Sequence, residues 1–314
     1  MTTTTKWGLV ATILAPADEI RRFAAYHLEA GAHRLYLYLD AENPDAFTSL
    51  KAHPKVRVIT CDDAYWQKLC GKRPQKHQVR QSHNATHAYH RADDVDWLIH
   101  MDVDEFLVAD RPLGKVLAEL PMEQKIARIR PMEALSGDAT AFKAFIPNGP
   151  KRAQIVSELY PTYGNYIKGG FLSHLAGKVF ARTGMVGIRV QIHNVFQDDA
   201  IIDGPEQQPG IDLAHLHAKS WPEWLTAYRY RLEKGSYRAD LAPNRPRDRG
   251  GLSMHELFAM IETEGGEPGL RAFFDEVCAD TPALRAALEA QGLLRRVDLA
   301  LDAKLPRHFP KPTG

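Results

Sequence analysis

The sequence predicts an α/β protein with a mixed, mainly parallel sheet flanked by helices and a helical extension at its carboxyl end. In the first hundred residues, apolar runs of strand length alternate with segments of helical periodicity. Short links join these segments, and from Trp221 the pattern turns helical again. Strands and helices that alternate with short links are typical of parallel sheets with right-handed crossovers.

The first strand is expected at Trp7–Leu14, which is apolar as far as the residues before Pro16. Asp18 and Glu19 then favour the start of a helix, whose apolar residues recur at helical spacing up to Gly31. Further strands are expected at residues 34–39, 56–61 and 97–101. In a parallel sheet the carboxyl ends of such strands face one crevice, where ligands bind.

The remaining elements follow from shorter signals. A polar helix is expected over residues 75–92 and another over 113–120, and extended pieces are expected at 127–129, 170–172, 178–181 and 186–192. Ser253 with Glu256 forms a capping box, and Thr281 with Pro282 opens a further helix. The tail from Pro306 to Gly314 is expected to be frayed.

Composition narrows the class of protein. The 314 residues are 44% hydrophobic and 25% charged, as in ordinary globular proteins, and the net charge of +1 argues against nucleic acid as a partner. Cys61, Cys70 and Cys278 are scattered, which favours a reducing compartment, the cytoplasm. No run approaches the roughly 20 apolar residues of a transmembrane segment, while peripheral membrane contact stays open.

The most informative motif is residues 97–106, an apolar run that ends in Asp102, Asp104 and Glu105. In an extended backbone, Asp102 and Asp104 point the same way and can share one cation, while Val103 turns inward. Mn²⁺ and Mg²⁺ prefer oxygen ligands and keep positions for substrate phosphates. We therefore expect a metal site, with Asp102 and Asp104 as its ligands and Glu105 in support. The other interpretation is a strand end followed by a solvated acidic loop.

Histidines are candidates for a further metal ligand, because an imidazole can join two carboxylates around Mn²⁺. His215 and His193 are the first candidates, and His217 is the alternative. The other interpretation of each is a structural histidine with its hydrogen bonds satisfied.

Four residues are candidates for binding a nucleotide ligand. Asp40 follows the second strand, where it could accept hydrogen bonds from a ribose or base, although residues 40–45 also read as a simple turn. Gln81 and Asn84 share one face of the helix over 75–92, and the other basic residues of that helix are interpreted as a solvated face. Lys178, next to a glycine, suits a phosphate.

Together these residues resemble the glycosyltransferase family 2 type proteins of bacteria, in particular the subgroup close to the family 92 glycosyltransferases. The resemblance covers about residues 7–240 and is carried by residues 7–14, His27, Gly31, 40–45, Gln81, Asn84, 96–107, Gly177, Lys178, His215, 219–221, Lys234 and Gly235. The sequence departs from the pattern after the first strand, where Leu14-Ala15-Pro16 replaces the usual Lys-Asn-Glu.

The resemblance implies a GT-A fold over residues 1–240, with a nucleotide-binding half at about 1–110, an acceptor half at about 111–240, and a helical extension at 241–314. It also implies a metal-dependent, hexosyltransferase-like enzyme. Such an enzyme moves a sugar from a nucleotide-diphosphate donor, with a UDP-sugar favoured, to a glycan, polysaccharide or other hydroxyl acceptor. Inversion of the anomeric configuration is expected. Asp40 would lie near the nucleoside, with Asp102 and Asp104 serving the ribose and the metal.

Inversion requires a carboxylate base aligned with the acceptor hydroxyl. Glu133 and Asp138 are the candidates, because they follow a predicted strand beyond the acidic motif, although spacing alone does not select them over Asp198 or Glu223. A metal-dependent phosphoesterase or nucleotidylyltransferase acting on nucleotide sugars is the main alternative function. A non-catalytic carbohydrate-binding protein is the third.

Overall fold

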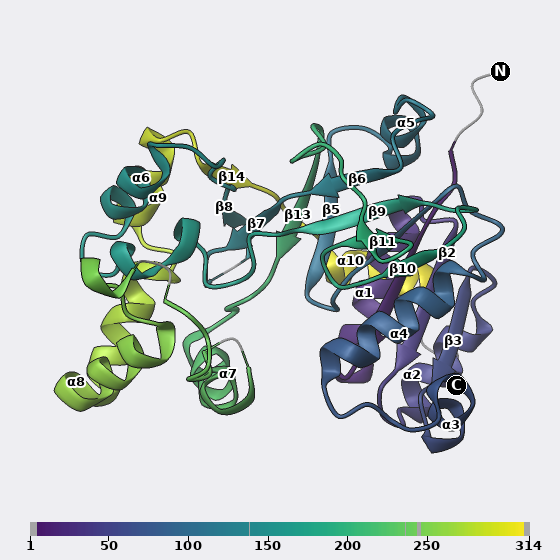
Figure 1. Cartoon of the computed structure of the whole chain (residues 1–314), viewed down its shortest axis with the longest axis horizontal. Helices are drawn as coiled ribbons and strands as arrows, with labels where there is room; N and C mark the ends of the chain where they lie inside the picture. The colour runs from purple at the N-terminus through teal and green to yellow at the C-terminus, as the bar shows by residue number, and fades with distance from the viewer. Residues whose placement is uncertain (1–4, 138, 236, 244–245, 311–314) are drawn as a thin grey trace. The chain divides into compact units, whose positions relative to one another are not determined.

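The computed structural model describes residues 5–137, 139–235, 237–243 and 246–310. The chain forms two compact units, each assembled from separate segments (Figure 1). Unit 1 comprises Met1–Arg130, Ala176–Leu213 and Leu299–Gly314, and unit 2 comprises Pro131–Leu175 and Ala214–Asp298. These bounds differ from the division at residues 110 and 240, which stays a prediction about function.

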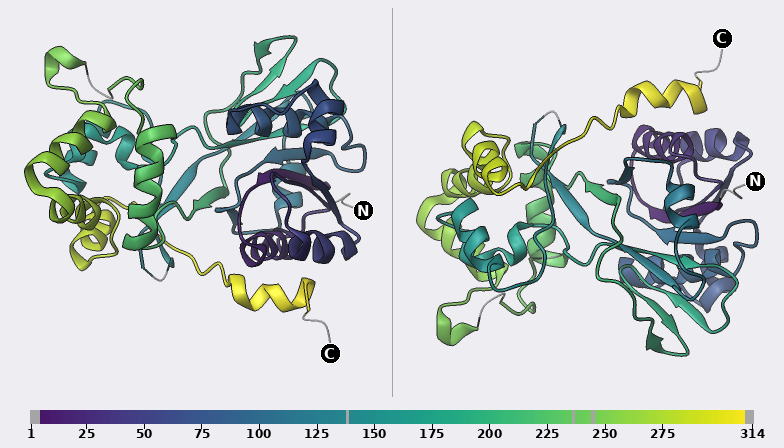
Figure 2. Two further views of the ribbon diagram at one scale, coloured as in Figure 1. Left: turned by 90° about the horizontal axis from the view of Figure 1, so that it is seen from below. Right: turned by 90° about the horizontal axis from the view of Figure 1, so that it is seen from above.

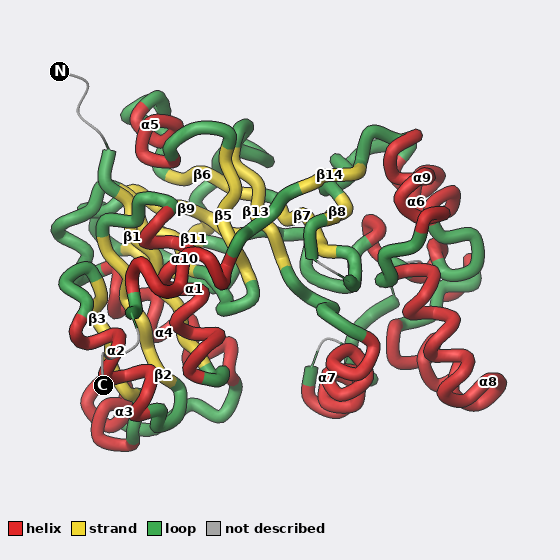
Figure 3. The backbone as a smooth tube through the Cα atoms, turned by 180° about the vertical axis from the view of Figure 1, so that it is seen from behind, coloured by secondary structure: helices red, strands yellow, loops and turns green. Residues whose placement is uncertain are grey.

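Unit 1 is built on a six-stranded sheet with the strand order β3-β2-β1-β4-β9-β6 (Figure 3). Its strands are β1 (Trp7–Ile13), β2 (Arg34–Leu39), β3 (Val56–Thr60), β4 (Trp97–His100), β6 (Ile126–Ile129) and β9 (Lys178–Arg182). The first four pair in parallel, and β9 runs antiparallel to both β4 and β6. The predicted mixed, mainly parallel sheet is confirmed.

The helices of unit 1 are α1 (Ala17–Glu29), α2 (Pro44–Ala52), α3 (Asp63–Cys70), α4 (His77–Tyr89), α5 (Leu113–Ala118) and α10 (Leu301–His308). Ala85 and Ala88 of α4 are fully buried in one apolar cluster with Val10 and Leu98 of the sheet. Because side chains alternate along a strand, the neighbours of Val10 point to the opposite face, where α1 lies (Figure 2). Helices therefore cover both faces of the sheet.

Smaller strands complete unit 1. An antiparallel sheet contains β10 (Ile188–Val190), β11 (Val195–Gln197) and β12 (Ala200–Ile201). The strand β5 (Glu105–Ala109) lies beside β13 (Ile211–His215), whose last two residues belong to unit 2.

The carboxyl-terminal segment corrects one prediction. The helix α10 continues to His308 and lies along α1, so the expectation of a frayed chain from Pro306 is wrong for these residues (Figure 2). Glu29 of α1 accepts hydrogen bonds from Arg307 at 2.6 Å and from His308 at 3.0 Å. Residues 311–314 lie outside the described part of the chain.

Unit 2 contains three strands in the order β14-β8-β7, namely β7 (Pro131–Ala134), β8 (Ala141–Lys143) and β14 (Leu294–Arg296). Its helices are α6 (Arg152–Leu159), α7 (Trp221–Lys234), α8 (Met254–Val277) and α9 (Pro282–Ala290), with short 3₁₀ turns η1 (Gly164–Tyr166), η2 (Lys168–Gly170) and η3 (Arg247–Arg249). The predicted capping box is present, since Ser253 and Glu256 bond reciprocally at the start of α8.

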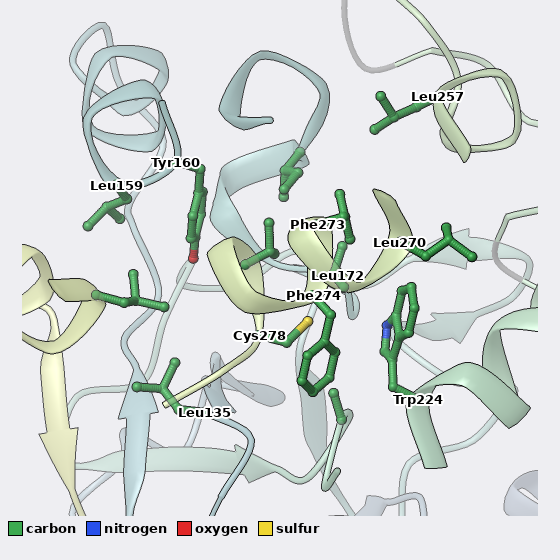
Figure 4. Packing of buried hydrophobic residues seen from close by; sticks show 14 of the residues in the cluster. Leu135, Leu159, Tyr160, Leu172, Trp224, Leu257, Leu270, Phe273, Phe274 and Cys278 are labelled. Atoms are coloured by element: carbon green, nitrogen blue, oxygen red, sulfur yellow. The ribbon is translucent and has the colours of Figure 1, made fainter. Parts of the chain in front are cut away.

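Aromatic residues form the core of unit 2. Trp224 of α7 stacks near Phe273 and Phe274 of α8, in a cluster that also holds Leu172 and Cys278 (Figure 4). Trp224 is a core residue of unit 2. Within the part of the chain that the structure describes, every helix is too short or too polar to cross a membrane.

Candidate functional site

A cluster of two carboxylates and one ammonium stands at the carboxyl end of β4. The strand ends at His100, and the buried Met101 and then Asp102 follow it. Lys178, the first residue of β9, has no exposed side-chain surface. Its Nζ lies 2.5 Å from Oδ2 of Asp102 and 3.2 Å from Oε2 of Glu105. The acidic motif and the Gly-Lys motif, separate in sequence, thus meet in one site.

The acidic motif is a turn and not an extended segment. The backbone N–H of Asp102 donates to Oε2 of Glu105 at 2.8 Å, and the N–H of Glu105 donates to the carbonyl of Asp102 at 3.1 Å. Val103 and the half-buried Asp104 form the turn between them. The expectation of an extended backbone with Val103 pointing inward is wrong, because the fully buried Glu105 folds back onto Asp102. The predicted supporting role of Glu105 agrees with its contact to Asp102.

The charge on Lys178 is held by its acidic neighbours. Burial lowers the pKa of a lysine, but here the carboxylates of Asp102 and Glu105 outweigh burial and raise the pKa above its ordinary value. The ammonium is therefore charged and bound to carboxylates, whereas the sequence predicted that it faces a phosphate. Phosphate binding by Lys178 stays a prediction.

The helix α4 adds two amide side chains, both buried. Gln81 donates from Nε2 to Oδ1 of Asp102, so this face of the helix points toward the acidic motif as expected. Asn84 donates to Oγ1 of Thr12 at 3.0 Å and accepts from the hydroxyl of Tyr65 at 2.6 Å. Both amides hold neighbouring side chains in place, and their binding of a nucleotide stays a prediction.

Asp40 stands at the carboxyl end of β2 and is engaged by cations. Its buried carboxylate accepts hydrogen bonds from Arg73 at 2.9 Å and from Arg80 at 2.8 Å, and it lies 3.4 Å from His77. Burial raises the pKa of Asp40, but the hydrogen bonds from His77 and Arg80 outweigh it and bring the pKa below the usual value. Arg80 is therefore not on a purely solvated helix face, and a ribose contact at Asp40 stays a prediction.

Two histidines lie close to Lys178. Nδ1 of His193 donates to the carbonyl of Gly177 at 2.8 Å, so in the neutral ring the lone pair is on Nε2. His100, buried at the end of β4, has no hydrogen-bond partner for either ring nitrogen among the described residues. Burial and the nearby Lys178 lower the pKa of His100 to about 3, so its ring is neutral. His100 was not among the predicted site residues, although it lies inside the acidic motif.

Unit 2 holds a cavity of about 570 Å³. His215 and His217, two of the predicted metal ligands, line it together with His174. The ring centroids of His174 and His215 are 5.3 Å apart, with ring nitrogens within 4.8 Å of each other. His174 was not among the predicted site residues, and its one signal in the sequence was its position close to Gly177 and Lys178.

Glu133 lies in β7 of unit 2, and one cation and two backbone N–H groups bind its carboxylate. Its carboxylate forms a buried ion pair with Lys143 at 2.7 Å and accepts the backbone N–H groups of Ser173 at 2.7 Å and Leu172 at 3.3 Å. Burial raises the pKa of Glu133, but Lys143 and His217 lower it well below its ordinary value. These contacts favour a positioning role for Glu133 over that of the base. Asp138 lies outside the described residues.

Comparison with known proteins defines the class. Residues 12–129 match the sequence model of glycosyltransferase family 92, and this segment contains α4 and the acidic motif. The match confirms the predicted resemblance, and the protein is a glycosyltransferase enzyme. No curated protein matches the chain in sequence.

Three solved structures with a similar α/β chain illustrate the likeness. HddC from Yersinia pseudotuberculosis is 11% identical, with 57% of this chain and 76% of that chain covered and a TM-score of 0.30. The glycosyltransferase GlyE of Streptococcus pneumoniae TIGR4 is 20% identical, with 40% and 30% covered and a TM-score of 0.26. The galactosyltransferase LgtC, solved with donor and acceptor sugar analogs, is 13% identical, with 56% and 57% covered and a TM-score of 0.26. These TM-scores are low, and the class assignment rests on the family match.

Proposed function

We propose that the protein is a metal-dependent, inverting glycosyltransferase of the GT-A type, which moves a sugar from a nucleotide-diphosphate donor to a hydroxyl of a glycan. The observation that carries this proposal is the position of Asp102. It lies within the segment that matches family 92, at the carboxyl end of a parallel strand, with Gln81 and Lys178 bound to its two oxygens. Ligands of open α/β sheets bind at this edge.

The donor, with a UDP-sugar favoured, is assigned to unit 1. Asp40 follows β2 and Asp102 follows β4, and both strands pair in parallel with β1. Their carboxyl ends therefore lie at the same edge of the sheet. Asp40 is assigned to the nucleoside end of the donor. Gln81 and Asn84 are assigned to support the side chains between Asp40 and Asp102.

The side chains around Asp102 suit Mn²⁺ or Mg²⁺. The two oxygens of Asp102 accept N–H groups from Gln81 and Lys178, and carboxylate oxygens are ligands that these cations prefer. Asp104 adds a second carboxylate, and His193 has the tautomer in which Nε2 can bind a metal. His215, with His217 as the alternative, stays a predicted ligand in unit 2. A bound metal would act as a Lewis acid on the departing diphosphate.

Other side chains orient this set. The buried Lys178 holds Asp102 and Glu105 in one arrangement, and Gln81 fixes the second oxygen of Asp102. Because both donors are buried or half-buried on regular elements, the carboxylate is held in place before a ligand binds.

The acceptor is assigned to the cavity of unit 2. Its aromatic residues Tyr166, Phe171 and Tyr237 suit the apolar face of a sugar ring. Glu133 is not proposed as the base for inversion, because its carboxylate is paired with Lys143 and accepts the backbone N–H of Ser173. Asp138 remains the predicted base.

A thermal-shift screen with UDP-, GDP-, CDP- and dTDP-sugars, each with and without Mn²⁺, tests donor binding. A ligand at 100 times its dissociation constant stabilises the folded state by about 2.7 kcal/mol. We expect a UDP-sugar to raise the melting temperature only with Mn²⁺, and we expect Asp102→Asn to remove the shift. The control Asp93→Asn changes an exposed aspartate of the same unit and should keep it.

Two results would overturn the proposal. One is the absence of any metal-dependent shift. The other is release of a sugar phosphate or free nucleotide from a nucleotide sugar with no need for an acceptor, which would favour a phosphoesterase or nucleotidylyltransferase.

A further inference from the structure

Among the described residues that line the cavity of unit 2, the side chains that carry a permanent charge are cationic. Nitrogen-bearing groups line it, namely Lys168, His174, His215, His217, Arg238 and His255. None of the described lining residues is an aspartate or a glutamate. A cavity with this lining favours a ligand that carries negative charge.

Two carboxylates of unit 2, Glu133 and Asp240, lie close to these lining groups, and neither cancels their charge. The charge of Glu133 is paired with the buried Lys143 at 2.7 Å. Asp240 contacts Arg238 at 2.7 Å, but its side chain is 68% exposed, and such surface pairs are weak. Lys168 is exposed and forms no ion pair with any described residue.

The loop that carries Lys168 has a fixed shape. Gly169 and Gly170 follow it with φ of 59° and 83°, which only glycine adopts without strain. A Cβ on Gly169 would lie 2.5 Å from the guanidinium of Arg152. Further along the loop, the backbone N–H groups of Leu172 and Ser173 donate hydrogen bonds to the carboxylate of Glu133. Lys168 and His174 are thus presented by one anchored segment.

Most of the rest of the cavity wall is apolar. Tyr166, Phe171, Tyr237, Leu241 and Met254 line it alongside the nitrogen-bearing groups. Aromatic surface suits the apolar face of a sugar ring, and lysine and arginine bind carboxylate or phosphate oxygens by charge-assisted hydrogen bonds.

We infer that the acceptor of this glycosyltransferase is an anionic sugar, one with a carboxylate or phosphate group that lies against Lys168 and Arg238. The inference rests on the proposed acceptor role of the cavity. It adds the class of acceptor, which the family match does not give.

Binding to the full chain is measured by ligand-observed NMR titration with matched pairs of sugars. The pairs are glucuronate with glucose, galacturonate with galactose, and glucose 6-phosphate with glucose. We expect at least one charged member to bind about tenfold more tightly than its neutral partner, with the preference lost as salt rises from about 0.05 to 0.5 M. The carboxylate and phosphate pairs distinguish the two sources of negative charge.

Variants locate the effect. Lys168→Gln and Arg238→Gln should each remove most of the preference for the charged sugar. Lys151→Gln, which removes an exposed lysine of the same unit outside the cavity, should leave it unchanged. Melting temperatures close to that of the wild type show that the variants are folded.

Other outcomes overturn the inference. Equal binding of charged and neutral sugars does so, as does an equal effect of Lys151→Gln. If UDP alone binds and Lys168→Gln weakens it, the cavity holds the donor diphosphate and the acceptor assignment is wrong. Transfer that proceeds only to neutral sugars refutes the anionic acceptor and leaves glycosyl transfer intact, whereas anion binding without any sugar transfer refutes the proposed function.

Discussion

The Nζ atom of Lys178 lies 2.5 Å from Oδ2 of Asp102, although 76 positions separate the two residues in the chain. The lysine side chain is fully buried, and Glu105 shares its charge at 3.2 Å. This ion pair joins the antiparallel strand β9 to the end of β4 and fixes the carboxylate that the proposed donor site depends on.

Replacing Lys178 by methionine should destabilise the fold. The change leaves Asp102 and the fully buried Glu105 without their cation, and loss of one partner of a buried pair costs about 3–5 kcal/mol. Urea unfolding of Lys178→Met measures the loss. The matched variant Lys51→Met changes an exposed lysine of the same unit and should stay within about 0.5 kcal/mol of the wild type. A loss below about 1 kcal/mol for Lys178→Met would contradict the role of the pair.

Glu133→Gln should lower stability and flatten its dependence on pH in acid. The native pKa of Glu133 is depressed, so its contribution is full above about pH 5 and decreases as the pH falls below about 4.3, the unfolded value, toward the native pKa. Lys143 loses its counter-charge in this variant, at a cost of about 3–5 kcal/mol near neutral pH. Unfolding free energies from pH 3 to 7 test both expectations.

Glu264→Gln, an exposed change in α8, is the control for Glu133→Gln and should follow the wild-type curve. If Glu133 were the catalytic base, Glu133→Gln would abolish transfer with unchanged stability. That result would reject the positioning role.

Gly177→Ala should be far more disruptive than Gly184→Ala. Both glycines have positive φ, 69° and 78°, so each alanine carries left-handed strain of about 1–2 kcal/mol. A Cβ on Gly177 would also lie 1.9 Å from the carbonyl oxygen of Ile129, while one on Gly184 meets no atom within 4 Å. We expect Gly177→Ala to cost about 1–3 kcal/mol more, measured by urea unfolding. Equal losses would show that the close approach to Ile129 is unimportant.

Asp40→Ala should cost about 1–3 kcal/mol, because the hydrogen bonds of Arg73 and Arg80 lose their acceptor. If Asp40 also contacts the nucleoside, the KM for the donor should rise beyond the effect of Asp93→Ala, an exposed control. A stability loss with an unchanged KM would restrict Asp40 to a structural role. Chemical denaturation measures the loss of stability, and kinetics at varied donor concentration measure the KM.

Local patterns predicted much of unit 1. Apolar runs located the parallel strands, and the contact of Gln81 with Asp102 agrees with the expected direction of its helix face. The helix α2 was missed, since residues 40–45 were interpreted as a turn. In the structure Asn43 caps α2 by accepting the N–H of Ala46 at 3.1 Å, and Pro44 starts the helix.

The pairing of charges could not be read from the sequence. Lys178 was expected to meet a phosphate, and Arg80 was expected on a solvated face, but both contact carboxylates far away in the chain. Such contacts depend on which strands become neighbours, and residue spacing does not contain that information. His174 was missed for the same reason, because its proximity to His215 exists only in the fold.

The most direct test of glycosyl transfer is product analysis with a UDP-sugar, Mn²⁺ and a panel of acceptor sugars, for the wild type and for Asp104→Asn. The wild type should release UDP and form a new glycosidic bond. Asp104→Asn should keep its melting temperature and lose about 100-fold or more of this rate, because charge on the leaving diphosphate is no longer stabilised. Transfer by Asp104→Asn at the wild-type rate, or a wild type that forms no glycosidic bond with any donor, would contradict the account.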